Sequence, residues 1–253
     1  MIPKLIFLGT GTSQGVPVIG CHCNVCASSD TRDQRLRASV YLEYQGVRLL
    51  IDAGPDFRQQ LLRAKISNID AILLTHQHID HIAGLDDIRA FNYINNRAMD
   101  IYAEERVHHA IKGMYPYAFK DDKYPGIPEF ALHTIDQNPF TVRGVEIIPI
   151  RVWHAKLPIL GFRIANLAYI TDANYIDDSE LTKLSDLSVL VINAVRQKPH
   201  ISHFTLAQAI AIVQKVGAKE GFITHISHRM GLHKEVEKVL PKGVSFAYDG
   251  LEL

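Results

Sequence analysis

The residues best suited to chemistry lie in one short segment, residues 75–81, which reads Thr-His-Gln-His-Ile-Asp-His. Its three imidazoles and one carboxylate are donor groups that zinc, manganese and iron accept. The segment directly follows the apolar run 71–74, which predicts a buried strand. Side chains that follow such a strand lie where α/β folds build their sites. We therefore expect a metal site here rather than a histidine-rich surface loop.

A second group of metal ligands lies near the N-terminus, where the chain has its three cysteines, Cys21, Cys23 and Cys26. An odd number of cysteines at such close spacing does not suit a disulfide framework, so we interpret them as thiolate ligands in a reducing compartment. Tetrahedral zinc requires a fourth ligand. His228 is the preferred candidate and His22, placed between two ligating neighbours, is the alternative. We expect this zinc to be structural, because four protein ligands leave no open position.

Composition and charge limit the classes of function. The 253 residues are 47% hydrophobic and contain no dividing linker, so we expect a single domain, 1–253. Lys plus Arg and Asp plus Glu both number 27, so no overall field attracts nucleic acid or a membrane, and we expect neither as a partner. The N-terminus lacks the layout of a signal peptide, and no apolar run is long enough to span a bilayer. We expect a cytoplasmic protein, and leave the formation of a homodimer open.

Apolar runs and helical periodicity indicate the elements that position these groups. The predicted strands are 5–8, 40–44, 47–51, 71–74, 145–150, 161–164, 167–170, 189–192, 221–223 and 244–248, with hairpin turns at Gln45-Gly46 and Asn166. The predicted helices are 56–64, 104–114, 179–184, 205–216 (capped by His203 or Thr205) and 234–240. Strand pairs mixed with helices predict layers in the order α, β, β, α. The stretch 115–128 is interpreted as a long surface loop and a candidate cover for a site.

Several motifs together resemble one known family. Residues 76–81 match the HxHxDH signature of the metallo-β-lactamase superfamily. The PhnP-like phosphodiesterases of this superfamily are similar in GTGTSQGVP at 9–17, the cysteine group, IDAG at 51–54, Thr171-Asp172, THISH at 224–228 and FAYDG at 246–250. The resemblance spans nearly the full chain. It implies an α+β fold, the αββα sandwich of two mixed sheets flanked by helices, and a hydrolase acting on a small, anionic and in some cases cyclic phosphodiester.

The resemblance also implies a site for two catalytic divalent metal ions, zinc or manganese, in addition to the structural zinc. The implied ligands are His76, His78 and His154 for one ion, Asp80, His81 and His225 for the other, and Asp172 as a bridge. Such an ion pair lowers the pKa of a bound water to about 7. The two divalent ions carry four positive charges, and Asp80, Asp172 and a hydroxide carry three negative charges. The remaining single positive charge favours an anionic substrate.

Further residues are expected to assist this site. Asp80 and His203 are the catalytic candidates: Asp80 belongs to the implied ligand set, and His203 matches a family histidine that precedes a helix. His203 is expected to act as general acid or phosphate contact, with His200 as the alternative. Asp52 is expected to orient a ligand imidazole through its second ring nitrogen. Residues 193–199 depart from the family pattern, which leaves the identity of the substrate open.

Two other functions are weighed against hydrolysis of a small phosphodiester. A tRNA 3′-processing nuclease would require an extended basic arm, and the chain has balanced charge and no insertion rich in Lys or Arg. A zinc-binding accessory protein, like relatives in PQQ biosynthesis, would lack a dinuclear ligand, whereas the implied set is complete. The GTGT opening at 9–12 is not a P-loop, so it does not argue for a nucleotide cofactor.

Overall fold

The computed structural model describes residues 2–120 and 125–253 and contains two β-sheets. The first is six-stranded, in the order β1-β2-β3-β4-β5-β6, and the second is eight-stranded, in the order β11-β8-β9-β10-β12-β13-β14, with β7 paired to β8. The strands of the first sheet are β1 (Lys4–Gly9), β2 (Ser39–Tyr44), β3 (Val47–Ile51), β4 (Ala71–Leu73), β5 (Met99–Ala103) and β6 (Phe130–Thr134). Those of the second are β7 (Phe140–Val142), β8 (Val145–His154), β9 (Leu157–Ile164), β10 (Leu167–Ile170), β11 (Tyr175–Ile176), β12 (Val189–Asn193), β13 (Glu220–Thr224) and β14 (Val244–Phe246).

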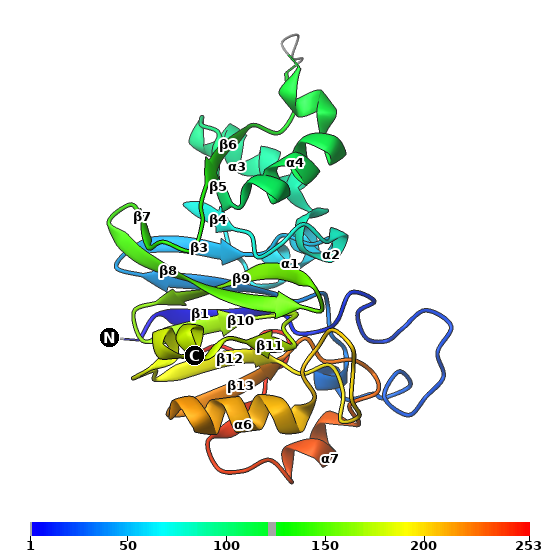
Figure 1. The fold of residues 1–253 in the computed structure, drawn as a ribbon. Helices are drawn as coiled ribbons and strands as arrows, with labels where there is room; N and C mark the ends of the chain where they lie inside the picture. The colour runs from blue at the N-terminus through cyan, green and yellow to red at the C-terminus, as the bar shows by residue number, and fades with distance from the viewer. Residues whose placement is uncertain (1, 121–124) are drawn as a thin grey trace.

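Helices cover the outer face of each sheet (Figure 1). On the first sheet these are α1 (Phe57–Arg63), α2 (Ile79–Ile82), α3 (Arg89–Asn95) and α4 (Glu105–Met114). On the second they are α5 (Asp178–Leu181), α6 (Leu206–Val216) and α7 (His233–Glu237). The layer order is therefore α, β, β, α, and the predicted α+β sandwich is confirmed. No helix in the described part of the chain is long and apolar enough to cross a membrane.

Alternation along the strands explains why their sequences read as continuous apolar runs. In β3, Leu49 and Ile51 belong to the core between the sheets, while Leu50 packs under the helices of the first sheet. In β12, Val191 faces the same central core and Leu190 faces the helices of the second sheet. Since successive side chains of a strand point to opposite faces, a strand buried on both faces reads as an apolar run, and the polar residues Arg48 of β3 and Asn193 of β12 lie toward the strand ends.

Several elements escape prediction from the sequence. The strands β5, β6, β7 and β11 and the helices α2 and α3 have no predicted counterpart. In β5 only alternate residues are buried, so polar Asp100 interrupts the apolar run. Helix α2 is four residues long and its polar positions belong to the HxHxDH motif, so it shows no apolar stripe. The predicted strands 47–51 and 167–170 are found with the predicted ends, and the other predicted elements are found with shifted ends. Thr205 caps α6 in a capping box with Gln208.

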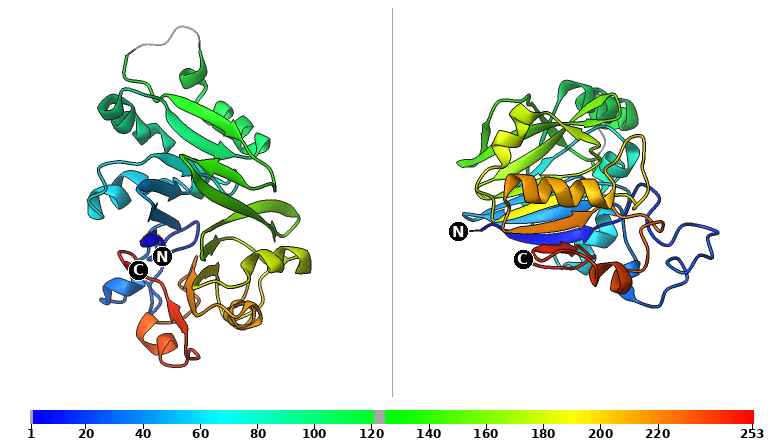
Figure 2. Two further views of the ribbon diagram at one scale, coloured as in Figure 1. Left: turned by 90° about the vertical axis from the view of Figure 1, so that its left-hand side faces the viewer. Right: turned by 60° about the horizontal axis from the view of Figure 1, so that its bottom comes forward.

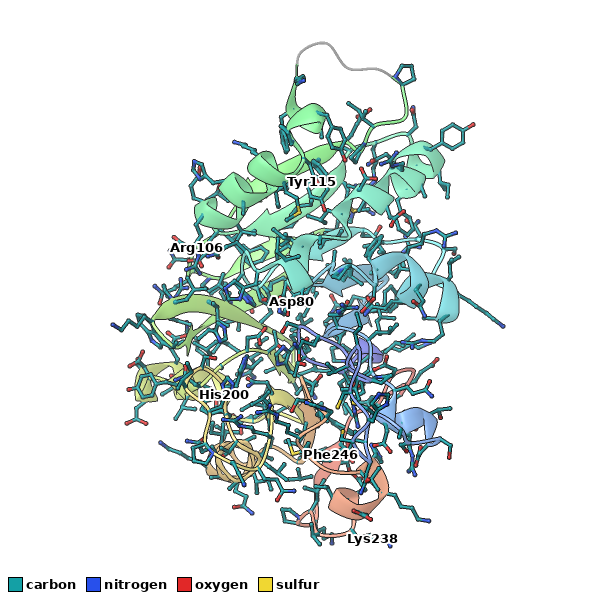
Figure 3. The ribbon with its side chains drawn as sticks, turned by 90° about the vertical axis from the view of Figure 1, so that its right-hand side faces the viewer. Asp80, Arg106, Tyr115, His200, Lys238 and Phe246 are labelled. Carbon is teal, nitrogen blue, oxygen red and sulfur yellow. The ribbon has the colours of Figure 1, made fainter. Side chains whose placement is uncertain are left out.

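The stretch 115–128 is only partly a surface loop. Tyr115 is buried, and its hydroxyl donates a hydrogen bond to the carbonyl of Ile82, 3.0 Å away. This bond connects the stretch to the last residue of α2. A 3₁₀ turn, Pro116–Phe119, follows. In Figure 3, Tyr115 lies beyond Asp80 on the side away from His200. The prediction that this stretch covers a site also concerns residues 121–124, which lie outside the described residues.

Strand direction brings the motifs to one edge of the sandwich. The strands β3 to β6 are parallel to one another, as are β10, β12, β13 and β14, so their carboxyl ends gather on two adjoining edges. Both ends of the chain lie together away from this edge (Figure 2), where Leu5 and Leu253 exchange backbone hydrogen bonds. Functional sites of α/β sheets lie at carboxyl ends.

Candidate metal centres

Strand ends from both sheets deliver the predicted ligands. Asp172 lies two residues beyond β10, His225 directly follows β13, and His154 is the last residue of β8. Asp172 and His225 have left-handed backbone conformations, with φ of 57° and 54°, as does Asp52 after β3, with φ of 64°. This conformation is uncommon for residues other than glycine. Three such residues at neighbouring strand ends indicate a functional site.

Asp172 lies at the centre of the site. Its Oδ2 is 2.6 Å from Nε2 of His81 and 3.7 Å from Nε2 of His76. Its Oδ1 is 2.9 Å from Nε2 of His225 and 3.3 Å from Nδ1 of His203. One compact set of potential ligand atoms comprises Asp80, His81, Asp172 and His225, as predicted for one ion. Asp172 also belongs to a second set, which is the arrangement that a bridging carboxylate requires.

The second compact set differs from the predicted one, because it consists of His154, Asp172 and His203. His76 and His78 border it. Nε2 of His76 lies 3.0 Å from Nδ1 of His78, and the two rings lie 5.8 and 5.2 Å from the ring of His154. The three predicted histidines thus lie close to one another, and His203 joins them as a further potential ligand.

Buried atoms without hydrogen-bond partners show that this donor set suits a cation. Within the described residues, Nε2 of His81, Oδ2 of Asp172 and both ring nitrogens of His225 are buried and accept or donate no hydrogen bond. Leaving a buried polar group unpaired costs about 1–3 kcal/mol. Imidazole nitrogens and carboxylate oxygens that face one another at 2.6 to 2.9 Å without hydrogen-bond geometry can instead share a divalent metal ion.

The charges around the site also favour a cation. Burial lowers the pKa of His76 well below its ordinary value, so its imidazole is neutral, the form that binds metals. Burial opposes the charged form of His81, but Asp52, Asp172 and Asp80 together raise its pKa well above the ordinary value. For Asp172, burial is outweighed by His225 and His81, and its pKa is lowered well below the ordinary value. A bound cation would supply the positive charge that the proton on His81 otherwise provides to these carboxylates.

Asp52 makes the predicted hydrogen bond to a ligand imidazole. Nδ1 of His81 donates a hydrogen bond to the carboxylate of Asp52 over 2.7 Å, and Nε2 of the same ring is directed at Asp172. The backbone amide of Thr75 also donates to Asp52 over 2.9 Å. Carboxylates that bond the far nitrogen of a ligand histidine fix its ring and tautomer. The expected contact of Asp52 with an imidazole is therefore present, and the role of His81 as a metal ligand stays a prediction.

The two histidines considered as proton donor differ in position. His203 lies in the set around Asp172, whereas His200 lies outside this set with its ring tilted against that of His203, at a distance of 4.9 Å between ring centres. Burial and the neighbouring His225 lower the pKa of His203 to about 3. A neutral imidazole at neutral pH suits metal binding or hydrogen-bond donation to phosphate better than general-acid catalysis. The general-acid role stays a prediction.

The cysteine cluster, Cys21, Cys23, Cys26 and His228, forms as predicted, whereas His22 is exposed and lies outside it. Nδ1 of His228 lies 3.2, 3.5 and 3.5 Å from the three sulfur atoms. Tetrahedral zinc with bonds of about 2.3 Å to sulfur and about 2.05 Å to nitrogen separates such atoms by about 3.6 Å. The backbone amide of Cys26 contributes most to lowering the pKa of Cys23 to about 6, which favours a thiolate. The geometry fits one zinc ion.

Sequence reasoning missed residues that hold the strand ends in place. The amide of Asn193, at the end of β12, exchanges two hydrogen bonds with the backbone of Ala173, at 2.8 and 2.9 Å, and so fixes the turn that carries Asp172. Three site residues each directly follow a buried threonine. His76 follows Thr75, Asp172 follows Thr171, and His225 follows Thr224. A polar residue that ends an apolar strand is the signal that could have revealed Asn193.

A cavity of about 320 Å³ adjoins the Asp172 centre and is called the site cavity below. Its wall includes His203 and His225 of the site, Thr12 and Gln14 of the segment after β1, and Arg196. In Figure 3, His200 lies on the opposite side of Asp80 from Tyr115. The ligand atoms therefore have access to a space large enough for a small molecule.

Comparison with known proteins places this architecture in a family. The family model described as a beta-lactamase superfamily domain matches residues 47–226. A crystal structure described as a new diphosphatase from the PhnP family is 41% identical, with a TM-score of 0.93, and covers 100% of this chain and 97% of the other. A Porphyromonas gingivalis protein named octanoyltransferase is 42% identical over 98% of this chain and 51% of its own length.

A third relative, coenzyme PQQ synthesis protein B of Xanthomonas campestris pv. campestris, is 30% identical over 62% of this chain and 54% of its own length. The chain thus spans about half the length of these two curated relatives. The matched family model, the two-sheet fold and the similarity to the PhnP-family structure agree with the motifs. This chain belongs to the metallo-β-lactamase superfamily and is a PhnP-like member of it.

Proposed function

We propose that this chain, as a single domain, is a hydrolase that uses two divalent metal ions, zinc or manganese, to cleave a small anionic substrate at a phosphoryl group that bridges two substituents. The observation that carries the proposal is the set of buried, unpaired ligand atoms around Asp172 beside an open cavity. Simple phosphodiesters and the linkage of a diphosphate both present such a phosphoryl group. The relative described as a diphosphatase supports the second kind.

The residues have distinct roles in this proposal. Asp80, His81 and His225 would hold one ion and His76, His78 and His154 the other, with Asp172 as the ligand common to both sets. When bound, the ions would supply Lewis acidity and an activated water molecule. His203 faces the site cavity and donates a hydrogen bond to the phosphoryl group, and Asp52 holds the ring of His81 in place.

Acyl transfer is the competing function, because one relative is named octanoyltransferase. An octanoyl chain requires an apolar channel, since burying hydrocarbon is its main source of binding energy. In the described residues, Val195 is the one apolar side chain in the wall of the site cavity, which otherwise consists of polar and cationic groups. This wall suits phosphate, and the other half of that longer relative is the more suitable place for acyl transfer.

Hydrolysis assays with matched variants test the proposal. We expect metal-loaded protein to hydrolyse bis(p-nitrophenyl) phosphate or 2′,3′-cyclic nucleotides, His76→Ala to be inactive, and His22→Ala to equal the wild type, because His22 is exposed and remote from the cavity lining. Metal analysis should give about three ions per chain, two of them removable by mild chelation. No turnover above the His76→Ala background, with one tightly held zinc, would favour an accessory role instead. Hydrolysis of octanoyl thioesters alone would favour acyl chemistry.

A further inference from the structure

The site cavity shares wall residues with a larger cavity, whose wall also has cationic side chains and includes Cys23 of the cysteine cluster. This second cavity, of about 820 Å³, shares Arg196, His228 and Arg229 with the site cavity and adds Lys198. No aspartate or glutamate among the described residues lines either cavity. The whole chain has equal numbers of basic and acidic residues, so this is a local excess of positive charge. Such an excess in a cleft attracts anions.

The cations of these walls are not neutralised by the protein. Within residues 2–120 and 125–253, Arg196, Lys198 and Arg229 form no ion pair, whereas most other arginines near the two sheets pair with a carboxylate. Nε of Arg196 donates to the carbonyl of Lys198 over 3.2 Å, and its terminal nitrogen donates to the carbonyl of Pro199 over 2.5 Å. These bonds fix the guanidinium in its turn without changing its charge, so it is preorganised for an anion.

The position of the arginines relates them to the reaction centre. His203 and His225 of the Asp172 centre line the same cavity as Arg196 and Arg229. His200 is also in the wall of this cavity, and its ring lies 4.9 Å from the ring of His203. A substrate whose phosphoryl group is held at Asp172 can therefore reach the two guanidinium groups through this one cavity.

We propose that Arg196 and Arg229 bind a second phosphate of the substrate, so that the preferred substrate class is a diphosphate with a substituent on each phosphate rather than a phosphodiester with a single charge. The substituent on the second phosphate would occupy the second cavity. This inference rests on the proposed function, because it names the substrate of the same site. Guanidinium groups suit the role, since they bind phosphate oxygens through two parallel hydrogen bonds.

The chemistry gives the arginines a role in the reaction. The oxygen of water forms a bond to the first phosphorus, and the bond from that phosphorus to the bridging oxygen breaks. The bridging oxygen keeps the electron pair and leaves as part of the second phosphate, while the protons of water pass to the product phosphates or to solvent. The departing phosphate gains one negative charge, which Arg196 and Arg229 stabilise where it develops.

Binding measurements test this inference separately from turnover. The probes are methylenediphosphonate, which has two phosphonate groups and a bridge that resists hydrolysis, and methylphosphonate, which has one. Calorimetric titration of the zinc-loaded protein gives both dissociation constants. We expect Arg229→Gln to weaken methylenediphosphonate binding about tenfold, Arg196→Gln to act similarly, and methylphosphonate binding to change less than about twofold. Arg58→Gln, an exposed arginine of α1 without an ion pair in the described residues, is the matched control.

The outcomes separate the inference from the proposed function. Selective weakening of methylenediphosphonate binding by both variants, with no effect of Arg58→Gln, supports a subsite for a second phosphate. Equal weakening of both probes, or no weakening of either, overturns the subsite while leaving the hydrolase proposal intact. Arginine-dependent binding of methylenediphosphonate by a protein that hydrolyses no phosphoryl substrate would overturn the hydrolase proposal and retain the subsite. Arg229 has no side-chain hydrogen bond among the described residues, so its replacement should not disturb folding.

Discussion

The two metal-binding clusters of this molecule are built in opposite ways. At the Asp172 centre the ligands come from strand ends of both sheets, and Asp172, His81 and His225 are almost fully buried. In the cysteine cluster, three of the four ligands lie within residues 21–26 and are only partly buried. The first arrangement depends on the packing of the whole sandwich, whereas the second can form from one short segment and one histidine.

The clusters also differ in how completely their ligands enclose an ion. The cysteine cluster provides four donors at the spacing of tetrahedral zinc, which leaves no position for a substrate. The Asp172 centre provides donors on both sides of one carboxylate and adjoins the site cavity. The cysteine cluster therefore suits a structural role and the Asp172 centre a catalytic one. His225 and His228, three residues apart, connect the two, because the cysteine cluster fixes the loop that carries His225.

Replacing Asp172 should have the largest effect if the two clusters differ in this way. Asp172→Asn removes the charge that both sets of ligands share, so we expect kcat/KM to fall about a thousandfold and metal content to drop to about one ion per chain. Elemental analysis and assays with bis(p-nitrophenyl) phosphate measure both effects. Asp178→Asn, at an exposed position of α5, is the matched control and should change neither. Full metal content in Asp172→Asn would contradict the bridging role.

Removing one cysteine should act on stability rather than on chemistry. In Cys26→Ser the zinc would lose a ligand, and we expect the free energy of unfolding to fall by about 3 kcal/mol and the Tm by about 6–12 °C. Scanning calorimetry of the metal-loaded proteins measures this. His22→Ala, next to the same ligands but exposed, should leave the Tm unchanged. An unchanged Tm with loss of activity in Cys26→Ser would contradict this prediction, because it would indicate that the cysteine cluster serves catalysis rather than stability.

How easily each cluster can be predicted from the sequence depends on whether its ligands are close together in the chain. Cys21, Cys23 and Cys26 are neighbours in the chain, so their spacing alone indicates a metal site. The HxHxDH segment is also local. By contrast, a lone histidine such as His154 or His203 carries no signal of its own, because its contact with Asp172 exists only after the two sheets have packed. The family resemblance, and not periodicity, placed His154 among the ligands.

The fold was predictable to the extent that burial is continuous along a strand. Strands buried on both faces, such as β3 and β12, read as apolar runs and were predicted. Strands with polar positions on one face, such as β5 and β6, were not, because Asp100 and His133 interrupt their apolar pattern. These two residues form a hydrogen bond across the strands at 2.7 Å, a contact between distant segments that no local pattern shows.

A smaller effect should follow from loosening one ligand of the Asp172 centre. In Asp52→Asn the ring of His81 loses its charged acceptor, so we expect metal affinity and activity at that centre to fall about 10- to 100-fold. Competition with a chelator measures the affinity, and the zinc of the cysteine cluster serves as the internal control because Asp52 does not contact it. Equal loss of metal from both clusters would indicate general unfolding instead.

The beginning of α7, five residues after His228, should respond to pH without any metal being involved. Burial and the nearby Arg35 lower the pKa of His233 to about 4, and Arg35 donates a hydrogen bond to its Nδ1 over 3.0 Å. Because the unfolded chain holds the His233 proton up to about pH 6.5, it binds more protons than the folded protein between these values. The free energy of unfolding should therefore decrease as pH falls from about 6.5 to about 4, by about 2 kcal/mol from this residue. Urea unfolding of wild type and His233→Gln at pH 7 and pH 5 measures it. Loss of metal at low pH affects both proteins alike, so only the difference between them reports on His233, and an equal pH dependence would show that this histidine is not the titrating group.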